Sequence, residues 1–565
     1  IPFTSLRFQP RDGNVTMGLI AYRYVARERQ MDIFPEIPPD WGFWSFVKLS
    51  KARDISCPAT ENKRPWFTSP YLLAGVGYHH VQPEGAPAAY PDKITDNRLT
   101  AGLDVQHALT SNMNLDISFN TDFAQVEVDD QVVNLSRFSL FFPEKRRFFL
   151  ERSSILDFGF EDDNRLFYSR RIGIDDGKIV PLWGGVRLVG RLKNYDVGVL
   201  TMESREQHGS PSENFSVLRL RRKVSRNNSY VGGILTSRTD WKGTTNLAYG
   251  LDGIIHLFRN DYLKVNLAGS WNAQDSLPGR RFLDNRKRLY IQWENRAQVG
   301  LHYALSYSQV DKNFSPAMGF EARGDFKAVG DRVSYGWFVS KHQSIRYMRV
   351  ALNSSAYFSS SSHRLESFLL APAFYVEWKK NSYLEMRFNR FYDNVQHAFP
   401  LSSNITIAQA EYVNNDIALA GQTPSVHFLN ATFNATAGTF YGGKRFSAAV
   451  TPAYTISRYL TLSGFYQYNY VSFSNAPNYV AHVARLKAAA SLNVKLSINA
   501  FVQVNSLTKV SAINFRFRYN SKDGNDLYFV YNEILNNEGN TDPFLPFSDA
   551  RAIMLKWIHT FHLGQ

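Results

Sequence analysis

Apolar and polar residues alternate strictly along several stretches of this chain. In the longest, residues 492–505, every second residue is Leu, Val, Ile or Ala, and the residues between them are polar except for Phe501. A period of two places each set on one face of a β-strand. Strands in soluble proteins average about 5–6 residues, whereas a tilted strand needs about 9–11 to cross a bilayer. This stretch is long enough to cross.

The same alternation recurs elsewhere in the chain. It is found at residues 115–120 and 513–520, and at the C-terminus Ile553, Leu555, Trp557, Phe561 and Leu563 share one face, with His559 as the exception. An ordinary soluble sheet is the alternative, but many strands of this length would then have to share one core. The pattern therefore predicts an all-β protein, a large transmembrane antiparallel β-barrel.

The connections between these strands predict how many times the chain crosses the membrane. Short turns are expected on the periplasmic side and long loops outside. Long connections lie near residues 81–96, 125–180, 274–285, 312–325 and 536–549. Keeping the short turns on one side requires a further strand near residues 405–413. The count is then about 24 strands, within a range of about 22–26, with both termini periplasmic.

Residues 125–180 form the longest stretch that lacks barrel alternation. Blocks of Phe alternate there with Glu, Lys and Arg, as in SRFSLFFPEKRRFFLERSSILDFGF. A solvated loop would expose too much apolar surface with this composition. A barrel this wide leaves an open lumen unless something fills it. We expect the segment to fold inward as a plug or constriction, the alternative being an extracellular cap that packs on itself.

The densest polar and aromatic constellation of the chain lies within this segment. Its charged members are expected to anchor the plug through ion pairs, and this interpretation is favoured. Alternatively, exposed guanidinium groups select anionic or polyhydroxylated solutes, because Arg presents a planar fork of donors. The residues expected at the plug and lumen are Phe141, Phe142, Glu144, Lys145, Arg146, Arg147, Phe148, Phe149, Glu151, Arg152, Arg170 and Arg171.

The first 60 residues differ from the remainder of the chain. IPFTSLRFQP has the pattern of a terminal strand, and MDIFPEIPPDWGFWSF is irregular and rich in Pro and Trp. We interpret residues 1–60 as the end of a periplasmic module followed by a linker. Residues 61–565 are then the barrel, with its first strand near residues 66–80.

Composition narrows the class of protein further. Aromatic residues make up 15 % and charged residues 20 % of the chain, and no apolar run reaches the length of a transmembrane helix. Aromatic girdles at the two interfaces of a barrel explain this combination. The net charge is +14, but Lys and Arg are scattered through alternating strands. We therefore expect a charged lumen or contact with anionic lipid, and no nucleic-acid partner.

No motif for catalysis or metal binding emerges. The chain has one cysteine, Cys57, and the adjacent His79 and His80 point to opposite faces of a strand. The acidic residues at 161–163, 175 and 176 lack the spacing of a calcium loop. A catalytic triad forms in space rather than in sequence. The expectation is a protein without catalytic activity, cofactor or metal.

Three motifs resemble a known family. They are FFPEKR with FYSRRIG, the stretch GGVRLVGRLKNYDVGVL, and DGNDLYFVYNE within RYNSKDGNDLYFVYNE. They resemble a large outer-membrane family common in Bacteroidetes, and the resemblance covers essentially the whole chain. It implies an N-terminal carbohydrate-binding family 9-like domain and a C-terminal barrel of unknown function. IPFTSLRF resembles the last strand of that domain, so glycans are an implied partner through the module that is missing here.

Two functional hypotheses follow. The first is a plugged barrel in the outer membrane of a Gram-negative bacterium that transports a solute, with glycan-derived solutes as candidates. The alternative is a non-catalytic structural subunit of a larger assembly, concerned with protein export, protein insertion or surface glycan handling. Outer-membrane lipid is the expected partner in both, together with other outer-membrane or periplasmic proteins in the second.

Overall fold

The computed structural model describes most of the chain. It covers residues 13–25, 30–37, 49–58, 66–81, 92–121, 129–175, 178–207, 209–225, 229–273, 286–297, 299–339, 344–424, 428–474, 476–537 and 546–563. The predicted strand at residues 1–10 lies outside these ranges. So do parts of the predicted long loops, namely residues 82–91, 125–128, 274–285 and 538–545.

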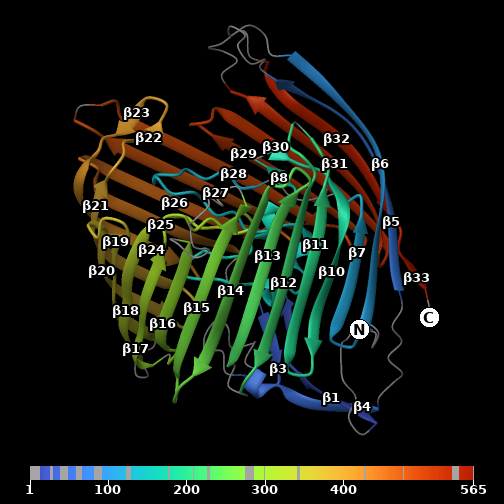
Figure 1. Cartoon of the computed structure of the whole chain (residues 1–565), viewed down its shortest axis with the longest axis horizontal. Helices are drawn as coiled ribbons and strands as arrows, with labels where there is room; N and C mark the ends of the chain where they lie inside the picture. Colours follow the sequence, from blue (N-terminus) through green and yellow to red (C-terminus); the bar gives the residue numbers. More distant parts are fainter. Residues whose placement is uncertain are drawn as a thin grey trace.

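The described strands form one closed antiparallel barrel, which confirms the predicted fold class (Figure 1). Strands β32 and β33 both pair with β5 and act as one interrupted strand, so the described residues form 24 barrel strands. The strands are β5 (Trp66–Val81), β6 (Asp92–Thr110), β7 (Met113–Phe119), β10 (Leu182–Leu192), β11 (Tyr195–Ser204), β12 (Glu213–Lys223), β13 (Tyr230–Asp240), β14 (Thr245–His256), β15 (Asp261–Asn272), β16 (Lys287–Asn295), β17 (Gly300–Val310), β18 (Phe326–Phe338), β19 (Ile345–Ser359), β20 (Leu365–Trp378), β21 (Tyr383–Val395), β24 (Ala410–Gln422), β25 (Leu429–Phe440), β26 (Gly443–Thr455), β27 (Leu460–Ser472), β28 (Tyr479–Ser491), β29 (Leu496–Asn505), β30 (Val510–Lys522), β31 (Asn525–Asn536), β32 (Ser548–Ile558) and β33 (Phe561–Leu563).

The alternation in sequence becomes an apolar outer face and a more polar inner face. On β14, Leu251 is 66 % exposed on the outside of the barrel, whereas the next residue, Asp252, is buried on the inside. An apolar outer band around a closed barrel is the surface that lipid covers. The barrel therefore has the architecture of an outer-membrane protein.

One predicted strand is shorter than its alternation suggests. Strand β29 begins at Leu496, and residues 492–495 form the turn before it. The side-chain oxygen of Asn493 accepts hydrogen bonds from the backbone N–H groups of Lys495 and Leu496, at 2.8 and 3.0 Å. Such a local bond favours a turn over the sheet ladder. Alternation alone does not reveal that the strand begins only after this turn.

Three two-residue turns, at 111–112, 193–194 and 523–524, lie at one end of the barrel, and the long connection from residue 120 to 181 lies at the other, as predicted. The separation is incomplete, because the two-residue turn at 441–442, between β25 and β26, lies at the same end as the long connections. The strand predicted near residues 405–413 begins later than predicted. Strand β24 begins at Ala410, and Ile405–Ile407 belongs to a small hairpin in the loop before it.

The remaining elements lie outside the barrel sheet. Strand β1 pairs with β4 and β2 with β3, and Figure 1 shows β1 and β4 below the lower end of the barrel. No helix in the described residues has the length and apolar character needed to span a membrane. These elements are β1 (Asn14–Leu19), β2 (Ala21–Val25), β3 (Gln30–Phe34), η4 (Leu49–Lys51), β4 (Arg53–Pro58), α1 (Arg147–Leu150), α2 (Ser153–Leu156), η5 (Ser169–Arg171), β8 (Ile174–Asp175), β9 (Lys178–Ile179), β22 (Phe399–Ser402) and β23 (Ile405–Ile407).

Candidate functional site: the inner segment and the lumen wall

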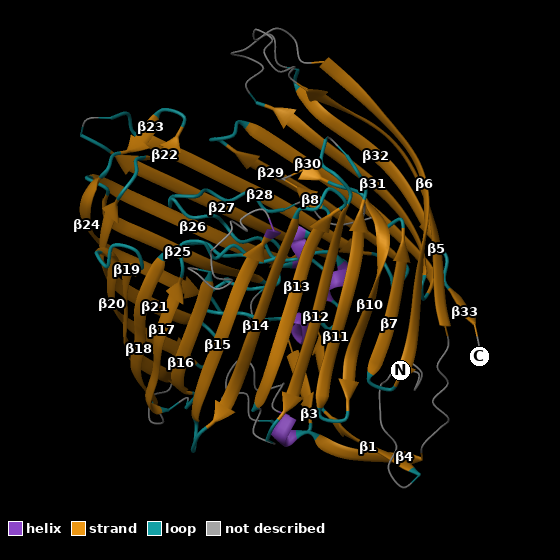
Figure 2. Cartoon of the chain, viewed as in Figure 1, coloured by secondary structure: helices purple, strands orange, loops and turns teal. Residues whose placement is uncertain are grey.

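Residues 129–175, which we call the inner segment, lie within the ring of strands. Figure 2 shows their loops and short helices in the middle of the barrel. The segment contacts opposite walls. The Gln131 N–H donates to Gln503 on β29 at 3.1 Å, and Phe158 packs against β14. The chain therefore crosses the lumen.

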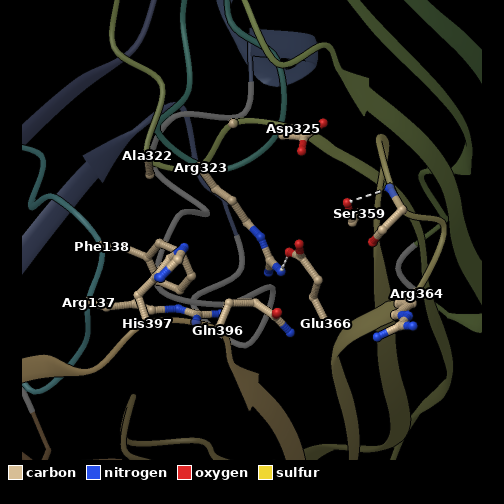
Figure 3. A pocket seen from close by; sticks show the side chains of 12 residues that line it. Arg137, Phe138, Ala322, Arg323, Asp325, Ser359, Arg364, Glu366, Gln396 and His397 are labelled. Atoms are coloured by element: carbon tan, nitrogen blue, oxygen red, sulfur yellow. Dashed lines mark hydrogen bonds and ion pairs between the residues drawn. The ribbon is translucent and has the colours of Figure 1, made fainter. Parts of the chain in front are cut away.

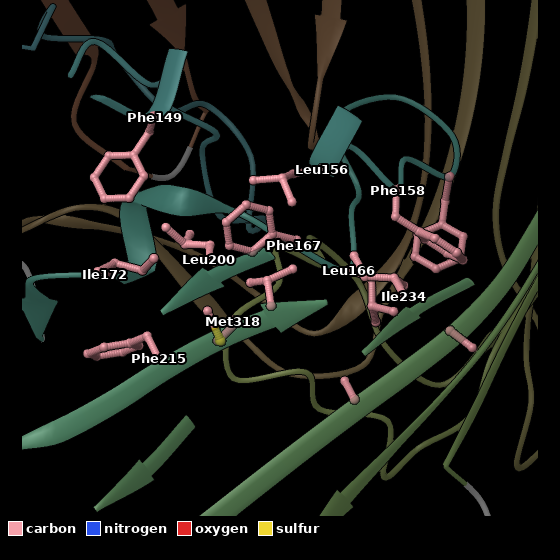
Figure 4. Packing of buried hydrophobic residues seen from close by; sticks show 14 of the residues in the cluster. Phe149, Leu156, Phe158, Leu166, Phe167, Ile172, Leu200, Phe215, Ile234 and Met318 are labelled. Carbon is pink, nitrogen blue, oxygen red and sulfur yellow. The ribbon is translucent and has the colours of Figure 1, made fainter. Parts of the chain in front are cut away.

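Two apolar clusters hold the inner segment to these walls. In the smaller one, Val133 packs with residues of β21, β25, β27 and β28 and of the β22–β23 hairpin. In the larger one, the inner segment contacts lumen-facing side chains of β10–β18, such as Leu200 and Phe215 (Figure 4). Many of the residues that face the lumen in this half of the wall are therefore apolar. The inner-segment members are Phe149, Leu156, Phe158, Phe160, Leu166, Phe167 and Ile172.

Glycines in the wall make room for these side chains. A Cβ at Gly250 would lie 2.6 Å from Cζ of Phe158, and one at Gly198 would lie 2.6 Å from Cδ2 of Leu156. Real side chains do not approach so closely, so a larger residue at either position would push the inner segment from the wall. Glycine weakens a strand, and here it allows the close approach of another part of the chain.

Arg187, on β10, is one of three fully buried arginines that face the inner segment. It is 1 % exposed, and its Nη2 lies 2.7 Å from Asp116 on β7. The same guanidinium donates to the backbone carbonyl oxygens of Phe148 and Glu151, the latter at 3.0 Å. Arg187 therefore connects two barrel strands to helix α1 and the residue after it.

Arg219, on β12, is the second of the three buried arginines that face the inner segment. Its side chain is 0 % exposed, and both its terminal nitrogens lie 2.6 Å from the carboxylate of Asp252 on β14. The Tyr230 hydroxyl donates to the same carboxylate at 3.0 Å. The guanidinium lies 5.3 Å from the ring centre of Phe158. The two parallel hydrogen bonds of this bidentate pair offset much of the cost of burying both charges, although Nε of Arg219 is buried without a partner in the described structure.

Arg288, on β16, is the third and contacts two carboxylates. It pairs with Glu161 of the inner segment at 2.5 Å, and with Glu321 of the loop between β17 and β18 at 3.0 Å. The ring of Phe160 lies 4.4 Å from the guanidinium carbon. Nearby, Lys264 donates to the backbone oxygen of Phe160 at 2.9 Å. The inner segment is thus tied to the wall by charge as well as by apolar packing.

The loop at residues 311–325, which we call the clasp loop, folds over the inner segment. Arg165 and Phe320 exchange backbone hydrogen bonds of 2.9 Å in both directions, and the Tyr168 N–H donates to the Met318 oxygen at 2.7 Å. The ring of Phe141 lies 4.9 Å from that of Tyr168 and 5.3 Å from that of Phe320. The clasp loop therefore holds the middle of the inner segment.

The FFPEKR motif folds around the carboxylate of Glu144. Arg146 donates to it from its backbone, Nε and Nη2 at 2.8–2.9 Å, and the Ser169 hydroxyl donates at 2.6 Å. Burial opposes the charge of this carboxylate, but the hydrogen bonds and charge of Arg146 and the Ser169 hydroxyl outweigh it, so the pKa of Glu144 lies below its usual value. Arg146 also donates to the Ile172 oxygen at 2.8 Å, which joins FFPEKR to FYSRRIG.

The other predicted site residues differ in their contacts. Arg170 and Lys145 both approach the carboxylate of Asp129. Arg171 donates to the Gly319 oxygen at 3.2 Å, and Arg152 donates to the Asn112 oxygen at 2.5 Å. The backbone carbonyl of Phe142 accepts a hydrogen bond from the Tyr168 hydroxyl. Phe148 and Phe149 pack in the larger cluster, and the Glu151 carboxylate lies 3.9 Å from Arg187.

Arg147 is the exception among the predicted residues. Its side chain is exposed and makes no hydrogen bond or ion pair with any residue that the structure describes. The sequence did not predict the roles of Arg187, Arg219 and Arg288 in the barrel wall, or the contact of the clasp loop with the inner segment. The alternation does reveal Arg219 as inward-facing, because it lies between the outward-facing Leu218 and Leu220. It does not reveal which segment meets that arginine.

The contact of the clasp loop with the inner segment is expected to depend on pH. Burial raises the pKa of Glu321 to about 7, against the lowering effect of Arg288 and with a further rise from Glu161. One oxygen of each carboxylate is buried without a hydrogen bond in the described structure. A raised pKa means that the stabilisation is complete below about 4.5 and is lost as pH rises through about 7.

We therefore expect the inner segment to be held more tightly at pH 5 than at pH 8, by ~3 kcal/mol. Hydrogen exchange of its backbone amides at the two pH values, corrected for intrinsic rates, measures this difference. Glu321→Gln imitates the protonated carboxyl and should remove most of the dependence. An unchanged dependence in that variant would assign the effect to other groups.

Part of the chain matches a known protein family. Residues 78–180 match the family model for a domain of unknown function, DUF5916. The match begins in β5 and extends through the whole inner segment, including FFPEKR and FYSRRIG. A comparison with curated protein sequences finds no match.

Several solved structures are similar to this chain at low identity and low TM-score. The ferric enterobactin receptor PfeA of Pseudomonas aeruginosa is 9 % identical with a TM-score of 0.39, over 87 % of this chain and 81 % of that one. BauA, the ferric preacinetobactin receptor of Acinetobacter baumannii, is 11 % identical with a TM-score of 0.39, over 90 % and 82 %. The siderophore receptor PirA of Pseudomonas aeruginosa is 9 % identical with a TM-score of 0.39, over 90 % of this chain and 82 % of that one. A likeness at this level does not extend to what these receptors bind.

Within the described residues, no group of three or more His, Cys, Asp or Glu side chains is arranged to hold a metal ion. The carboxylates of the inner segment are instead directed at guanidinium groups, as in the pairs of Glu144 with Arg146 and of Glu161 with Arg288. The carboxylates of this site are therefore engaged in ion pairs with arginines of the inner segment and the barrel wall.

Proposed function

We propose that this protein is a plugged outer-membrane barrel that admits a solute when the inner segment moves. The observation that carries the proposal is the course of the inner segment, which packs against both the β10–β18 wall and the β21–β29 wall. A segment that joins opposite walls obstructs the lumen between them. In this proposal the predicted site residues form the plug.

The barrel is built so that the segment can leave it. Every barrel strand pairs with two other barrel strands, and no inner-segment residue takes part in these ladders. The contacts between segment and wall include ion pairs and hydrogen bonds such as Glu161 to Arg288, which water can replace at similar free energy. Displacement would therefore leave a closed wall with a hydrated lumen.

The resemblance of the motifs to a Bacteroidetes family supports a more specific version of the proposal. A carbohydrate-binding family 9-like module would precede the barrel on the periplasmic side, where both termini would lie, and the solute would be glycan-derived. The small sheets β1–β4 and β2–β3 would then belong to the connection between module and barrel. The DUF5916 match covers the plug but not that module.

One observation favours the second candidate, a structural subunit of a larger assembly. An apolar groove of about 1050 Å³ lies on the outer wall over β12–β15, between leucines such as Leu218 and Leu251 and around Gly233 and Gly253. Grooves lined by small residues allow close contact between membrane-embedded proteins. If the barrel serves an assembly, this is the part of its wall that a partner would cover.

A reversible disulfide tests whether the plug must move. Arg165 and Phe320 form a hydrogen-bonded antiparallel pair, and cysteines in such a pair lie close enough to join. In a Cys57→Ser background, Arg165→Cys with Phe320→Cys would fix the inner segment to the clasp loop. Oxidised protein in vesicles should lose the entry of small sugars, and reduction should restore it.

Each single cysteine variant, oxidised in the same way, serves as the control and should keep the permeability of the Cys57→Ser protein. Equal permeability of the locked and reduced forms would overturn displacement of the plug. Such a result would favour the structural subunit, in which the segment is packed permanently.

A further inference from the structure

A separate pocket lies on the side of the inner segment where the long loops begin. Its cavity of about 460 Å³ is bounded by Arg137 and Phe138 of the inner segment, by the end of the clasp loop, and by the loops that follow β19 and β21 (Figure 3). We propose that this pocket binds a small hydroxylated organic anion, with Arg364 as the charge that recognises it.

The arginines of the pocket differ in whether they have an acidic partner. Arg137 lies 2.9 Å from Asp393, and Arg323 lies 2.6 Å from Glu366. Arg364, on the loop between β19 and β20, is exposed at the pocket and has no hydrogen bond or ion pair from its guanidinium to any described residue. One guanidinium therefore faces the cavity with all of its donors available.

The neighbouring carboxylates do not replace an anionic ligand. Asp325 accepts two hydrogen bonds from the Ser361 hydroxyl, at 2.8 and 2.9 Å, and its carboxylate lies more than 4 Å from the Arg364 nitrogens. Glu366 is held by Arg323. A free guanidinium fork matches the geometry of a carboxylate or phosphate group better than that of a neutral solute.

The rest of the lining suits the hydroxyl groups of such an anion. Gln396 and His397 are exposed at the pocket, and Figure 3 places them beside Arg137 and Phe138. Amide, imidazole and Ser362 hydroxyl groups donate and accept hydrogen bonds, and the Phe138 ring offers an apolar face. The volume lies within the range of small-molecule sites and is far larger than an inorganic ion needs.

The position of the pocket connects binding to the plug. Arg137 and Phe138 belong to the inner segment, so a bound anion would contact the wall and the plug together. The pocket's role as an entry site rests on the proposed function, whereas its binding of an anion does not. The two are measured separately.

Calorimetry on the purified full chain tests the inference, with D-glucuronate, D-glucose 6-phosphate and D-glucose as probes. The two anions should bind at least about tenfold more tightly than glucose, because only they can form a charge-assisted hydrogen bond with the Arg364 guanidinium. Arg364→Gln should remove that preference, and Arg364→Lys should restore part of it. Arg458→Gln, a change in the turn at the opposite end of the barrel, should keep the wild-type preference.

Equal binding of the three probes, no binding of any, or an unchanged preference in Arg364→Gln would each overturn the anion site. Those results would leave the disulfide lock unaffected, because the lock reports movement of the plug with neutral sugars. Conversely, a failed lock with anion binding intact would reject the transport role and retain the pocket.

Discussion

A barrel that lacks residues 138–160 is expected to conduct ions severalfold better than the intact protein. These residues include both short helices and the aromatic side chains that pack on β10–β18. Their removal takes away about half of the inner segment, and a barrel of this many strands then gains an aqueous path through its lumen.

The wall should survive the deletion, because its charged residues keep partners of their own. Arg187 retains Asp116, and Arg219 retains Asp252, since both of these acids lie on barrel strands. Glu161 lies just outside the deleted residues, and Arg288 also retains Glu321 of the clasp loop. Water that enters the lumen hydrates the remaining polar groups.

Conductance of single barrels in planar bilayers measures this effect. Resistance of the barrel to unfolding in detergent at room temperature shows that the deletion variant has folded. Arg147→Ala with Leu150→Ala is a matched control, because both side chains are exposed on the same segment and their loss should leave the plug in place. A folded deletion variant with the conductance of the intact protein would show that the inner segment does not block the lumen.

Arg219→Leu is expected to lower the free energy of unfolding by about 3–5 kcal/mol. The substitution leaves the carboxylate of Asp252 buried with only the Tyr230 hydroxyl as a partner. An unpaired buried charge is far more costly than the loss of a typical hydrogen bond. The Phe158 ring also loses its contact with the guanidinium, so the plug should loosen.

A second substitution separates the buried charge from the loss of packing. Combining Arg219→Leu with Asp252→Leu removes both charges, and the double variant should recover most of the lost stability, since apolar replacements of buried pairs are often nearly neutral. Urea unfolding followed by tryptophan fluorescence in lipid vesicles gives the free energies.

Arg222→Leu, three residues along the same strand, is the control. Its side chain is exposed near the end of β12, so the change should cost less than about 1 kcal/mol. If Arg219→Leu cost as little as this control, water would have to hydrate the Asp252 carboxylate in the folded variant, and the pair would not anchor the wall.

The extent of the barrel could be predicted closely because each strand carries its own signal. Leu251 and Asp252 are neighbours in sequence and face opposite sides of the wall, as the period of two requires. The predicted strand starts were wrong where local hydrogen bonds form a turn or a hairpin within an alternating stretch. Asn493 stops β29 four residues short of the predicted start, and the β22–β23 hairpin displaces the strand predicted near residues 405–413.

The candidate site was predicted only in part. FFPEKR and FYSRRIG identified the charged and aromatic core of the inner segment, and the contact of Arg146 with Ile172 now joins the two motifs. Their partners on the wall could not be found, because Glu161 and Arg288 are 127 residues apart and no periodicity relates them. The unpaired Arg364 is likewise visible only once three distant loops meet.

The sequence by itself determined the class of the protein, because alternation, strand length and the spacing of turns are local properties that every barrel strand repeats. Only the tertiary structure decided what fills the barrel and what remains free within it. A guanidinium at an inward position is equally suited to anchoring a plug or to binding a solute. Burial against a carboxylate assigns Arg187, Arg219 and Arg288 to the first role, and the lack of such a partner leaves Arg364 for the second.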